Sequence, residues 1–173
     1  MIPTVRVNSL PEASLAVQDF RDFFDAEYRR LSRALFLITG SVTEAEDLAQ
    51  DALVRVFERW ERVRAMASPT GYLYRTAMNL HRSRLRHFAM AARRLITSGT
   101  SSDPSAEVEG KDEIDRLLRS LPAGQRAALV LVEWLGLDAA EAAAVLGIEP
   151  VSVRVRLWRA RDTLRNTIGG GDE

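Results

Sequence analysis

Four carboxylates, Glu44, Glu46, Asp47 and Asp51, fall within one short stretch of this sequence and could serve as general acid, general base or metal ligands. Such chemistry needs a second cluster or a histidine set to face the first. The chain has no cysteine and only two histidines, which excludes thiolate zinc sites and disfavours a multi-histidine metal site. We therefore expect no catalytic residue, no metal and no cofactor. Metal-dependent hydrolysis that is lost in Asp47→Ala would be the sign of an enzyme instead.

Arginine side chains could instead bind phosphates, and they gather where acidic residues are missing. After Glu61 the next acidic residue is Asp103, and between them stand Arg62, Arg64, Arg75, Arg82, Arg84, Arg86, Arg93 and Arg94. The formal net charge of the chain is +0, which by itself argues against nucleic acid. A local cluster of positive charge nevertheless attracts phosphates whatever the net charge. This segment therefore predicts contact with nucleic acid.

A second group of arginines lies in "VSVRVRLWRA", residues 151–160, which alternates like a half-buried strand. The flanking residues favour a helix. Asp138 and Glu141 have the spacing of a capping box, Gly147 suits a left-handed C-cap, and Pro150 suits the first turn of a further helix. A helix, a tight glycine turn and a second helix make a helix-turn-helix, whose second helix enters the major groove of DNA.

A helix over 150–165, wound at about 100° per residue, places Val153, Leu157, Ala160 and Leu164 on one apolar face. The other faces hold the candidate DNA contacts, which are Ser152, Arg154, Val155, Arg156 and Arg159. Small and basic residues early in such a helix reach base edges, and arginines around them hold phosphates. A solvated, arginine-rich surface helix is the alternative.

The elements that must position these side chains are all expected to be helical. Helical periodicity runs over 18–39 and stops at Gly40, and Thr43 with Glu46 forms the capping box of a helix over 44–60. The apolar stripe of that second helix comprises Ala45, Leu48, Ala49, Ala52, Leu53, Val56, Phe57 and Trp60.

Ser68 is the expected N-cap, and Pro69 the first residue, of a third helix that runs to about Leu95. A small, polar and acidic stretch follows, and helical patterns then resume. The fold class we expect is all-α, with two small helical domains joined by a flexible linker, the C-terminal one a helix-turn-helix. The expected parts are an N-terminal extension (1–17), a first domain (18–96), a linker (97–112), a second domain (113–168) and a tail (169–173).

No stretch of the sequence reaches the ~18 apolar residues of a membrane span. The N-terminal twenty residues lack the uncharged apolar core of a signal peptide. The absence of cysteine fits a reducing compartment. We therefore expect a cytoplasmic protein with no membrane insertion.

Three segments together resemble a bacterial RNA polymerase sigma factor of the extracytoplasmic-function group, group IV of that superfamily, over about residues 18–168. "AEDLAQDALVRVFERW" is similar to the segment that grips the clamp helices of the largest polymerase subunit. "GYLYRTAMNLHRSRLR" is similar to the segment that reads and melts the −10 promoter element. "SLPAGQRAALVLVEWLGLDAAEAAAVLGIEPVSVRVRLWRARDTLR" is similar to the domain that reads the −35 element.

This resemblance implies promoter-specific initiation of transcription by core RNA polymerase, with the clamp helices and the flap of the polymerase, promoter DNA and an anti-sigma factor as partners. The implied polymerase-binding residues are Asp47, Gln50, Asp51, Val54 and Glu58. The implied −10 contacts are Tyr72, Arg75, Asn79, Arg82, Arg84 and Arg86. The implied −35 contacts are the candidates named above, which are Ser152, Arg154, Val155, Arg156 and Arg159.

Aromatic residues among arginines suit the unstacked bases of a melted promoter, which agrees with this assignment. Tyr72 stands where the family often has tryptophan, and Tyr74 offers a second flat ring unless one of the two belongs to the core. Asn79 matches a family position near the pocket for a flipped −10 base, and the loop 62–70 matches much of that pocket.

Several positions depart from the family pattern. Glu149 is a poor N-cap for the recognition helix, Val155 replaces a small polar residue, and Ser83 replaces an aspartate. Val155 therefore predicts an apolar base contact, for example to a thymine methyl. His81 and His87 are expected to be bystanders on the basic face.

The linker limits how the two domains work together. Its 16 residues extend to at most about 55 Å and average about 22 Å as a flexible coil. Promoter elements one to two turns apart need several tens of Å, at ~34 Å per turn. We expect a free protein that is compact or variable and that opens on the polymerase. The alternative is a stand-alone operator-binding regulator, which would leave the acidic and aromatic–arginine helices unexplained.

Overall fold

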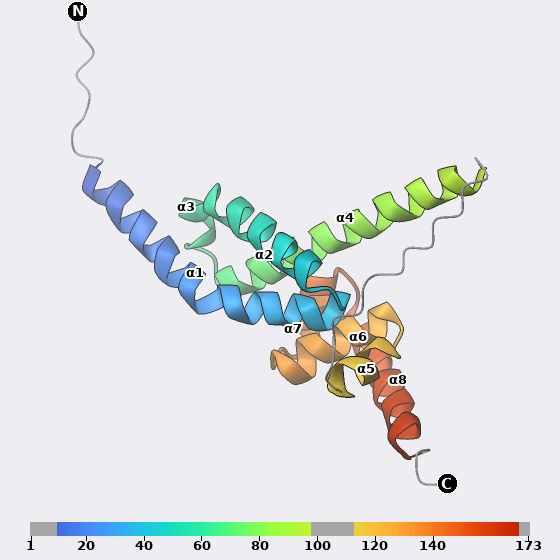
Figure 1. Cartoon of the computed structure of the whole chain (residues 1–173). Helices are drawn as coiled ribbons and strands as arrows, with labels where there is room; N and C mark the ends of the chain where they lie inside the picture. Colours follow the sequence, from blue (N-terminus) through green and yellow to red (C-terminus); the bar gives the residue numbers. More distant parts are fainter. Residues whose placement is uncertain (1–9, 98–112, 170–173) are drawn as a thin grey trace, which may run out of the picture.

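The computed structural model describes residues 10–97 and 113–169, and every regular element in these two ranges is helical (Figure 1). The first range forms α1 (Leu10–Thr39), α2 (Val42–Phe57), α3 (Trp60–Val63) and α4 (Pro69–Thr97). The second range forms α5 (Glu113–Arg119), α6 (Ala123–Leu129), the π-helical turn η2 (Val130–Trp134), α7 (Ala139–Leu146) and α8 (Pro150–Gly169). The expected all-α fold with two helical units is confirmed.

The first unit is built on α2, which packs between α1 and α4. Its core comes from leucines that lie on one face of each helix, and the fully buried ones are Leu31, Leu35, Leu48, Leu53 and Leu73. Burying one such side chain stabilises the fold by ~1.5–3 kcal/mol. An aromatic cluster joins α1 to the end of α2 and to α3, with the ring centroid of Phe20 4.8 Å from that of Phe57 and 5.3 Å from that of Trp60.

The start of α2 differs from the expectation. Gly40 takes a left-handed φ of 77° at the end of α1, and Ser41 then caps α2 by accepting a hydrogen bond from the Glu44 backbone N–H at 3.2 Å. The predicted cap at Thr43 is therefore wrong by two residues. The string "SVTEAE" holds two overlapping Ser/Thr-x-x-Glu patterns, and the glycine turn selects the first.

Two further boundaries differ from those expected, and one expected cap is confirmed. α1 begins at Leu10, so part of the expected extension 1–17 is helical. The helix expected over 44–60 stops at Phe57, and Trp60 starts the separate short helix α3. Ser68 does cap α4, because its Oγ accepts a hydrogen bond from the Gly71 N–H at 3.0 Å. The expected linker lies outside the described residues from 98 onward, as do residues 1–9 and 170–173.

The second unit holds the predicted helix-turn-helix. Asp138 and Glu141 form the capping box of α7, and Gly147 ends that helix with φ 64°. The Ile148 N–H donates to the Ala143 carbonyl at 3.1 Å, which is the 6→1 bond of a Schellman motif. Pro150 then starts α8, as predicted. These local caps fix the angle at which α8 leaves α7.

The two units pack against each other. α4 contacts α7, and α1 contacts α6 and η2, so one hydrophobic core runs through both units. Arg30 donates from Nη2 to the Leu135 carbonyl at 2.8 Å, and Arg82 donates to the Leu146 carbonyl. Figure 1 shows α7 beneath the crossing of α1 and α4, while the C-terminal half of α4 projects beyond α2.

Candidate functional site

The helix α8 presents its candidate residues on the side away from the core. Val153 and Leu157 are buried against α6 and α7, which confirms a helix in place of the strand-like alternation. Arg154, Val155 and Arg159 are exposed. The apolar face therefore holds α8 in place and leaves these three side chains available to a ligand.

Ser152 and Arg156 occupy the flank of α8 and are half-buried. Arg156 lies along α6, since a Cβ built at Gly124 would come within 3.1 Å of its Nη1. Arg156 therefore lies beside the outward face that carries Arg154 and Arg159. It could contact a ligand on α8 only at the border of that face nearest α6.

A groove between α2 and α4 brings together residues from both of the other predicted sets. Its volume is about 650 Å³. The predicted residues that line it are Asp51, Val54, Glu58, Tyr72, Arg75 and Asn79. Arg59 also lines it and donates from Nη1 to the Tyr72 hydroxyl at 3.2 Å. This hydrogen bond raises the pKa of Arg59. Arg59 was not predicted, because a residue at the end of a helix gives no periodic signal.

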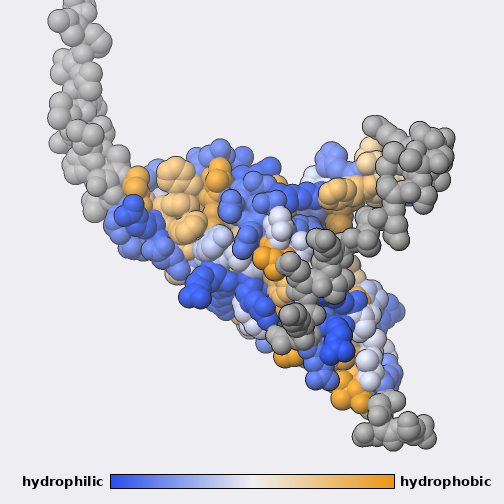
Figure 2. Space-filling model, in the orientation of Figure 1, coloured by the Kyte–Doolittle hydropathy of each residue, from blue (hydrophilic) through white to orange (hydrophobic). Residues whose placement is uncertain are grey.

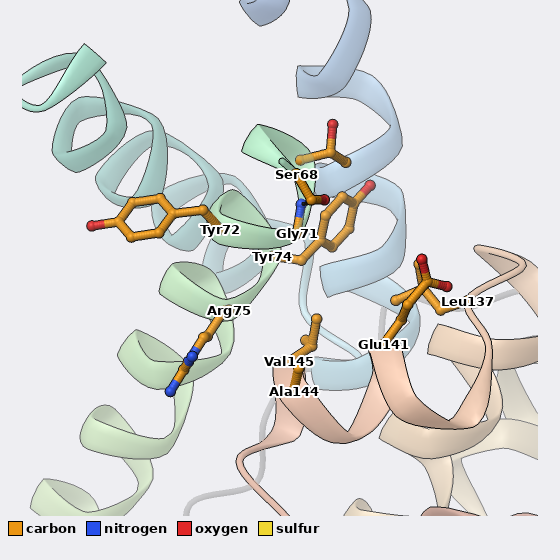
Figure 3. Close-up of a pocket in the computed structure, with 10 residues that line it drawn as sticks. Ser68, Gly71, Tyr72, Tyr74, Arg75, Leu137, Glu141, Ala144 and Val145 are labelled. Atoms are coloured by element: carbon orange, nitrogen blue, oxygen red, sulfur yellow. Dashed lines mark hydrogen bonds between the residues drawn. The ribbon is translucent and has the colours of Figure 1, made fainter. Parts of the chain in front are cut away.

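Tyr72 and Tyr74 leave opposite sides of α4 (Figure 3). Tyr72 is half-buried beside the groove, whereas Tyr74 is only 4% exposed and faces the core. Burial raises the pKa of Tyr74 far above its usual value, with a smaller contribution from Glu27. Only Tyr72 of the two can offer its ring to a base, so the core alternative holds for Tyr74.

The arginines of α4 do not form one continuous surface. Arg84 pairs with Asp51 at 2.7 Å, so a predicted DNA contact and a predicted polymerase contact bind each other. Arg82 turns toward α7 and donates to the carbonyl of Leu146 as well as to the side chain of Asn79. Burial lowers the pKa of Arg82, with smaller effects of two neighbouring arginines. Arg86 is exposed.

The carboxylates of α2 do not converge on one point. Glu44 lies 3.1 Å from Nδ1 of His81, whereas Asp51 pairs with Arg84. Glu46 and Asp47 are exposed. His81 is buried, so the expectation of a surface bystander is wrong for it, while His87 is exposed. Within the described ranges, no group of three or more acidic or histidine side chains could hold a metal ion.

An apolar groove of about 310 Å³ lies beside the acidic face of α2 and was missed from the sequence. Its lining residues are Phe20, Phe24, Gln50, Leu53, Val54 and Phe57. Phe57, predicted to be core, is half exposed. Figure 2 shows hydrophobic surface between α1 and the end of α2, in a largely hydrophilic face. Gln50 and Val54 therefore sit at the border of a polar face and an apolar one.

A third cavity, of about 340 Å³, lies between the two units (Figure 3). Tyr74 and Arg75 line it from α4, and Glu141, Ala144 and Val145 line it from α7. The N-terminal part of α4 is thus partly covered by the helix-turn-helix. In the helices that the structure describes, none is both long and apolar enough to cross a membrane.

Two family models match this chain. The model for Sigma-70 region 2 matches residues 23–89, and the model for Sigma-70, region 4 matches residues 111–164. The first range contains the α2–α4 groove, and the second contains the helix-turn-helix.

Curated relatives extend the similarity over most of the chain. The ECF RNA polymerase sigma factor SigM of Mycobacterium tuberculosis is 31% identical over 151 residues, which is 87% of this chain and 77% of that protein. The RNA polymerase sigma-E factor of Streptomyces avermitilis is 29% identical over 163 residues, covering 90% of this chain and 88% of that protein.

Solved structures that share the fold include those of RpoE and CnrH. The sigma factor RpoE, solved in complex with the anti-sigma factor NepR from Bartonella quintana, matches with a TM-score of 0.71 and 22% identity, over 90% of this chain and 99% of that chain. CnrH, solved in complex with the cytosolic domain of CnrY, matches with a TM-score of 0.61 and 23% identity, over 92% of this chain and 96% of that chain.

Proposed function

This chain belongs to the extracytoplasmic-function sigma factors, and from that premise we propose how its surfaces divide the work of promoter-specific initiation between core RNA polymerase and DNA. Sigma factors are regulatory subunits that direct core polymerase to promoters. The proposed site of action is the cytoplasm, where the polymerase works. The observation that carries the proposal is the pairing, in one chain, of an outward-facing helix α8 with the groove between α2 and α4.

α8 is proposed to read the −35 element. Arg154 and Arg159 are exposed on a helix whose other face is held by the core. The second helix of a helix-turn-helix lies in the major groove, with its first turns at the bases. Ser152 and Val155 occupy those first turns, and Arg156 approaches the backbone from the α6 side. Each phosphate that an arginine contacts releases counterions, so −35 binding should weaken steeply with salt.

The α2–α4 groove is proposed to hold the −10 element and to help melt it. Tyr72, Arg75 and Asn79 line one wall, where Arg75 and Asn79 are exposed and Tyr72 is half-buried. An aromatic ring stacks on an unpaired base whatever its identity, and the stacking contributes ~1–3 kcal/mol per base. The hydrogen bond from Arg59 orients the Tyr72 ring and leaves its face available. Arg84 and Arg86 would follow the phosphates along α4.

The outer face of α2 is proposed to bind the clamp helices of the polymerase. Asp47, Gln50 and Glu58 are exposed there, and Val54 leads into the apolar groove beside Phe57. An apolar centre with a charged rim is the usual anatomy of a protein interface. Asp51 belongs to the same set, and its pairing with Arg84 would couple polymerase binding to the orientation of the −10 surface.

The arrangement in which α4 packs on α7 is proposed to be a closed state of the free factor. Arg82, one of the proposed −10 contacts, is engaged with α7, and the cavity between the units opens beside Tyr74 and Arg75. Promoter binding would require the two units to separate, with the polymerase holding them in register. Small-angle scattering of the free and polymerase-bound chain tests this step, and an identical domain separation in both forms would contradict it.

An anti-sigma factor is proposed as a further partner. The solved structures of RpoE and CnrH, which share this fold, were both determined with a partner of their own, and the partner of RpoE is an anti-sigma factor. A protein that stabilises the closed state would keep Arg82 on α7 and so block initiation.

Variants that separate the two binding functions test the proposal. Asp47→Arg reverses a charge on the outer face of α2 and should abolish co-elution with core polymerase. Arg154→Ala should leave co-elution unchanged and lower promoter-dependent transcription, because it removes only a DNA contact. Glu46→Arg, which also reverses an exposed charge on α2 but outside the proposed set, is the matched control and should bind core polymerase normally. Co-elution of Asp47→Arg at the wild-type level would contradict the proposed polymerase surface.

A further inference from the structure

The exposed face of α8 carries an apolar stripe that phosphate binding does not explain. Val151, Val155 and Trp158 follow at i, i+4 and i+7, and their exposed fractions are 60%, 43% and 66%. They lie opposite Val153 and Leu157, which belong to the core. Contiguous apolar surface on an otherwise polar helix marks an interaction site.

Arginines line both edges of this stripe. At about 100° per residue, Arg154 lies on one side and Arg159 on the other. Both are exposed, and in the described part of the chain neither side chain forms an ion pair. One turn beyond Trp158 stands Asp162, whose carboxylate lies 3.8 Å from Arg165. The positive charge of this face therefore lies mainly between Arg154 and Arg159, and a polyanion would be attracted most strongly there.

We propose that Val151, Val155 and Trp158 read thymine methyl groups in the major groove of the −35 element, an inference that rests on the function proposed above for α8. The thymine C5-methyl is the apolar group that base pairs present in that groove. None of the three side chains can accept a hydrogen bond, and only the Trp158 indole can donate one, so the stripe discriminates by apolar contact.

The length of the stripe sets how many bases it covers. From Val151 to Trp158 the helix rises by about 10 Å, at 1.5 Å per residue. That length matches about three base steps of 3.4 Å each. The −35 element should therefore contain two or three neighbouring A·T pairs whose thymine methyls face α8.

A protein partner is the main competitor for such a surface. DNA is favoured because the positive edges match the two phosphate strands that border a major groove. The stripe also begins at the N-terminal turn of α8, which is the part that a helix-turn-helix inserts among the bases. A second copy of this chain would instead bring two sets of arginines together.

The test uses the full chain assembled with core polymerase and promoters in which single −35 thymines are replaced by uracil. Uracil keeps every hydrogen-bonding group of thymine and lacks only the methyl. Loss of one buried methyl should weaken binding of the wild-type holoenzyme about fourfold at each contacted position. Val155→Ala or Trp158→Ala should remove that difference at the positions they contact. Ile168→Ala, which removes a 65% exposed side chain on the same helix away from the stripe, should keep it.

The outcomes distinguish this inference from the function on which it rests. Equal binding of thymine and uracil promoters by wild-type holoenzyme, with promoter choice intact, would overturn the methyl readout and leave the proposed function standing. Loss of all promoter choice over random duplex would overturn the proposed function itself. A Val155→Ala variant that weakens binding to the thymine promoter and to the uracil promoter by the same factor would also contradict the inference, since the stripe would then contact DNA without distinguishing the methyl group.

Discussion

Alanine substitution at two glycines separates the cost of backbone strain from the cost of losing the contact between the two units. Gly136 and Gly147 have φ of +73° and +64°, where an L-residue costs ~1–2 kcal/mol. A Cβ at Gly136 would meet nothing within 4 Å, whereas one at Gly147 would lie 3.1 Å from Nη1 of Arg82. Gly147→Ala therefore displaces the guanidinium that donates to Leu146, and Gly136→Ala does not.

The expected magnitudes follow from these contacts. A hydrogen bond with a charged partner contributes ~1.5–3 kcal/mol, and the lower end applies to Arg82 because it is only half-buried. Gly136→Ala should lower the free energy of unfolding by ~1–2 kcal/mol through backbone strain alone. Gly147→Ala should lower it by ~2.5–3.5 kcal/mol, the sum of strain and the lost hydrogen bond.

Urea unfolding followed by circular dichroism measures these differences, with an unchanged slope against urea concentration as the check that the unfolding transition stays comparable. Arg82→Ala provides the second arm of a double-mutant cycle. In that background Gly147→Ala should cost no more than Gly136→Ala, because the contact is already absent. Equal costs of the two glycine variants in the wild-type background would refute the closed arrangement of α4 on α7.

Three further predictions concern the first unit. Tyr74→Phe should raise the free energy of unfolding by ~1 kcal/mol near neutral pH, because the Tyr74 hydroxyl is buried and has no hydrogen-bond partner among the described residues. Burial raises the folded-state pKa of Tyr74, so above pH ~10 the unfolded chain loses the phenol proton more readily than the folded chain does. The free energy of unfolding should therefore fall as the pH rises above ~10, and this alkaline loss of stability should be smaller in Tyr74→Phe. Leu73→Ala should lower stability by ~2–5 kcal/mol in thermal or urea unfolding, because Leu73 is fully buried. Asp51→Asn should change stability by less than ~1 kcal/mol, since its ion pair with Arg84 is partly exposed to solvent, while core polymerase binding, measured by co-elution, should fall.

Each of these has a result that would count against it. A Tyr74→Phe variant with the same alkaline loss as the wild type would mean that another group titrates. A Leu73→Ala variant of wild-type stability would contradict the packing of α4 on α2. An Asp51→Asn variant that binds polymerase normally would remove this residue from the proposed interface.

Local signals in the sequence were sufficient for the helix-turn-helix. The Asp138 capping box, the left-handed Gly147 and Pro150 each act within a few residues, so their structures follow from short-range sterics and hydrogen bonding. The helical character of 151–160 followed from these neighbours and not from its own alternation. The division into two helical units followed from the change of composition after α4.

Contacts between residues far apart in the chain could not be predicted from the sequence. Arg82 and Leu146 are 64 positions apart, and no periodic pattern links them. The pairing of Arg84 with Asp51 likewise requires the packing of α4 on α2. Helical periodicity assigned Phe57 to the core, but it could not show that α1 leaves this last turn of α2 half uncovered. The residue roles themselves remain predictions, supported by position and exposure.

The central claim is that this chain directs core RNA polymerase to specific promoters. Run-off transcription with core polymerase on a random promoter library tests it most directly. We predict transcripts from a small enriched set of templates that share two spaced elements, with A·T pairs in the upstream one. A transcript population that shows no enrichment over core polymerase alone would contradict the account.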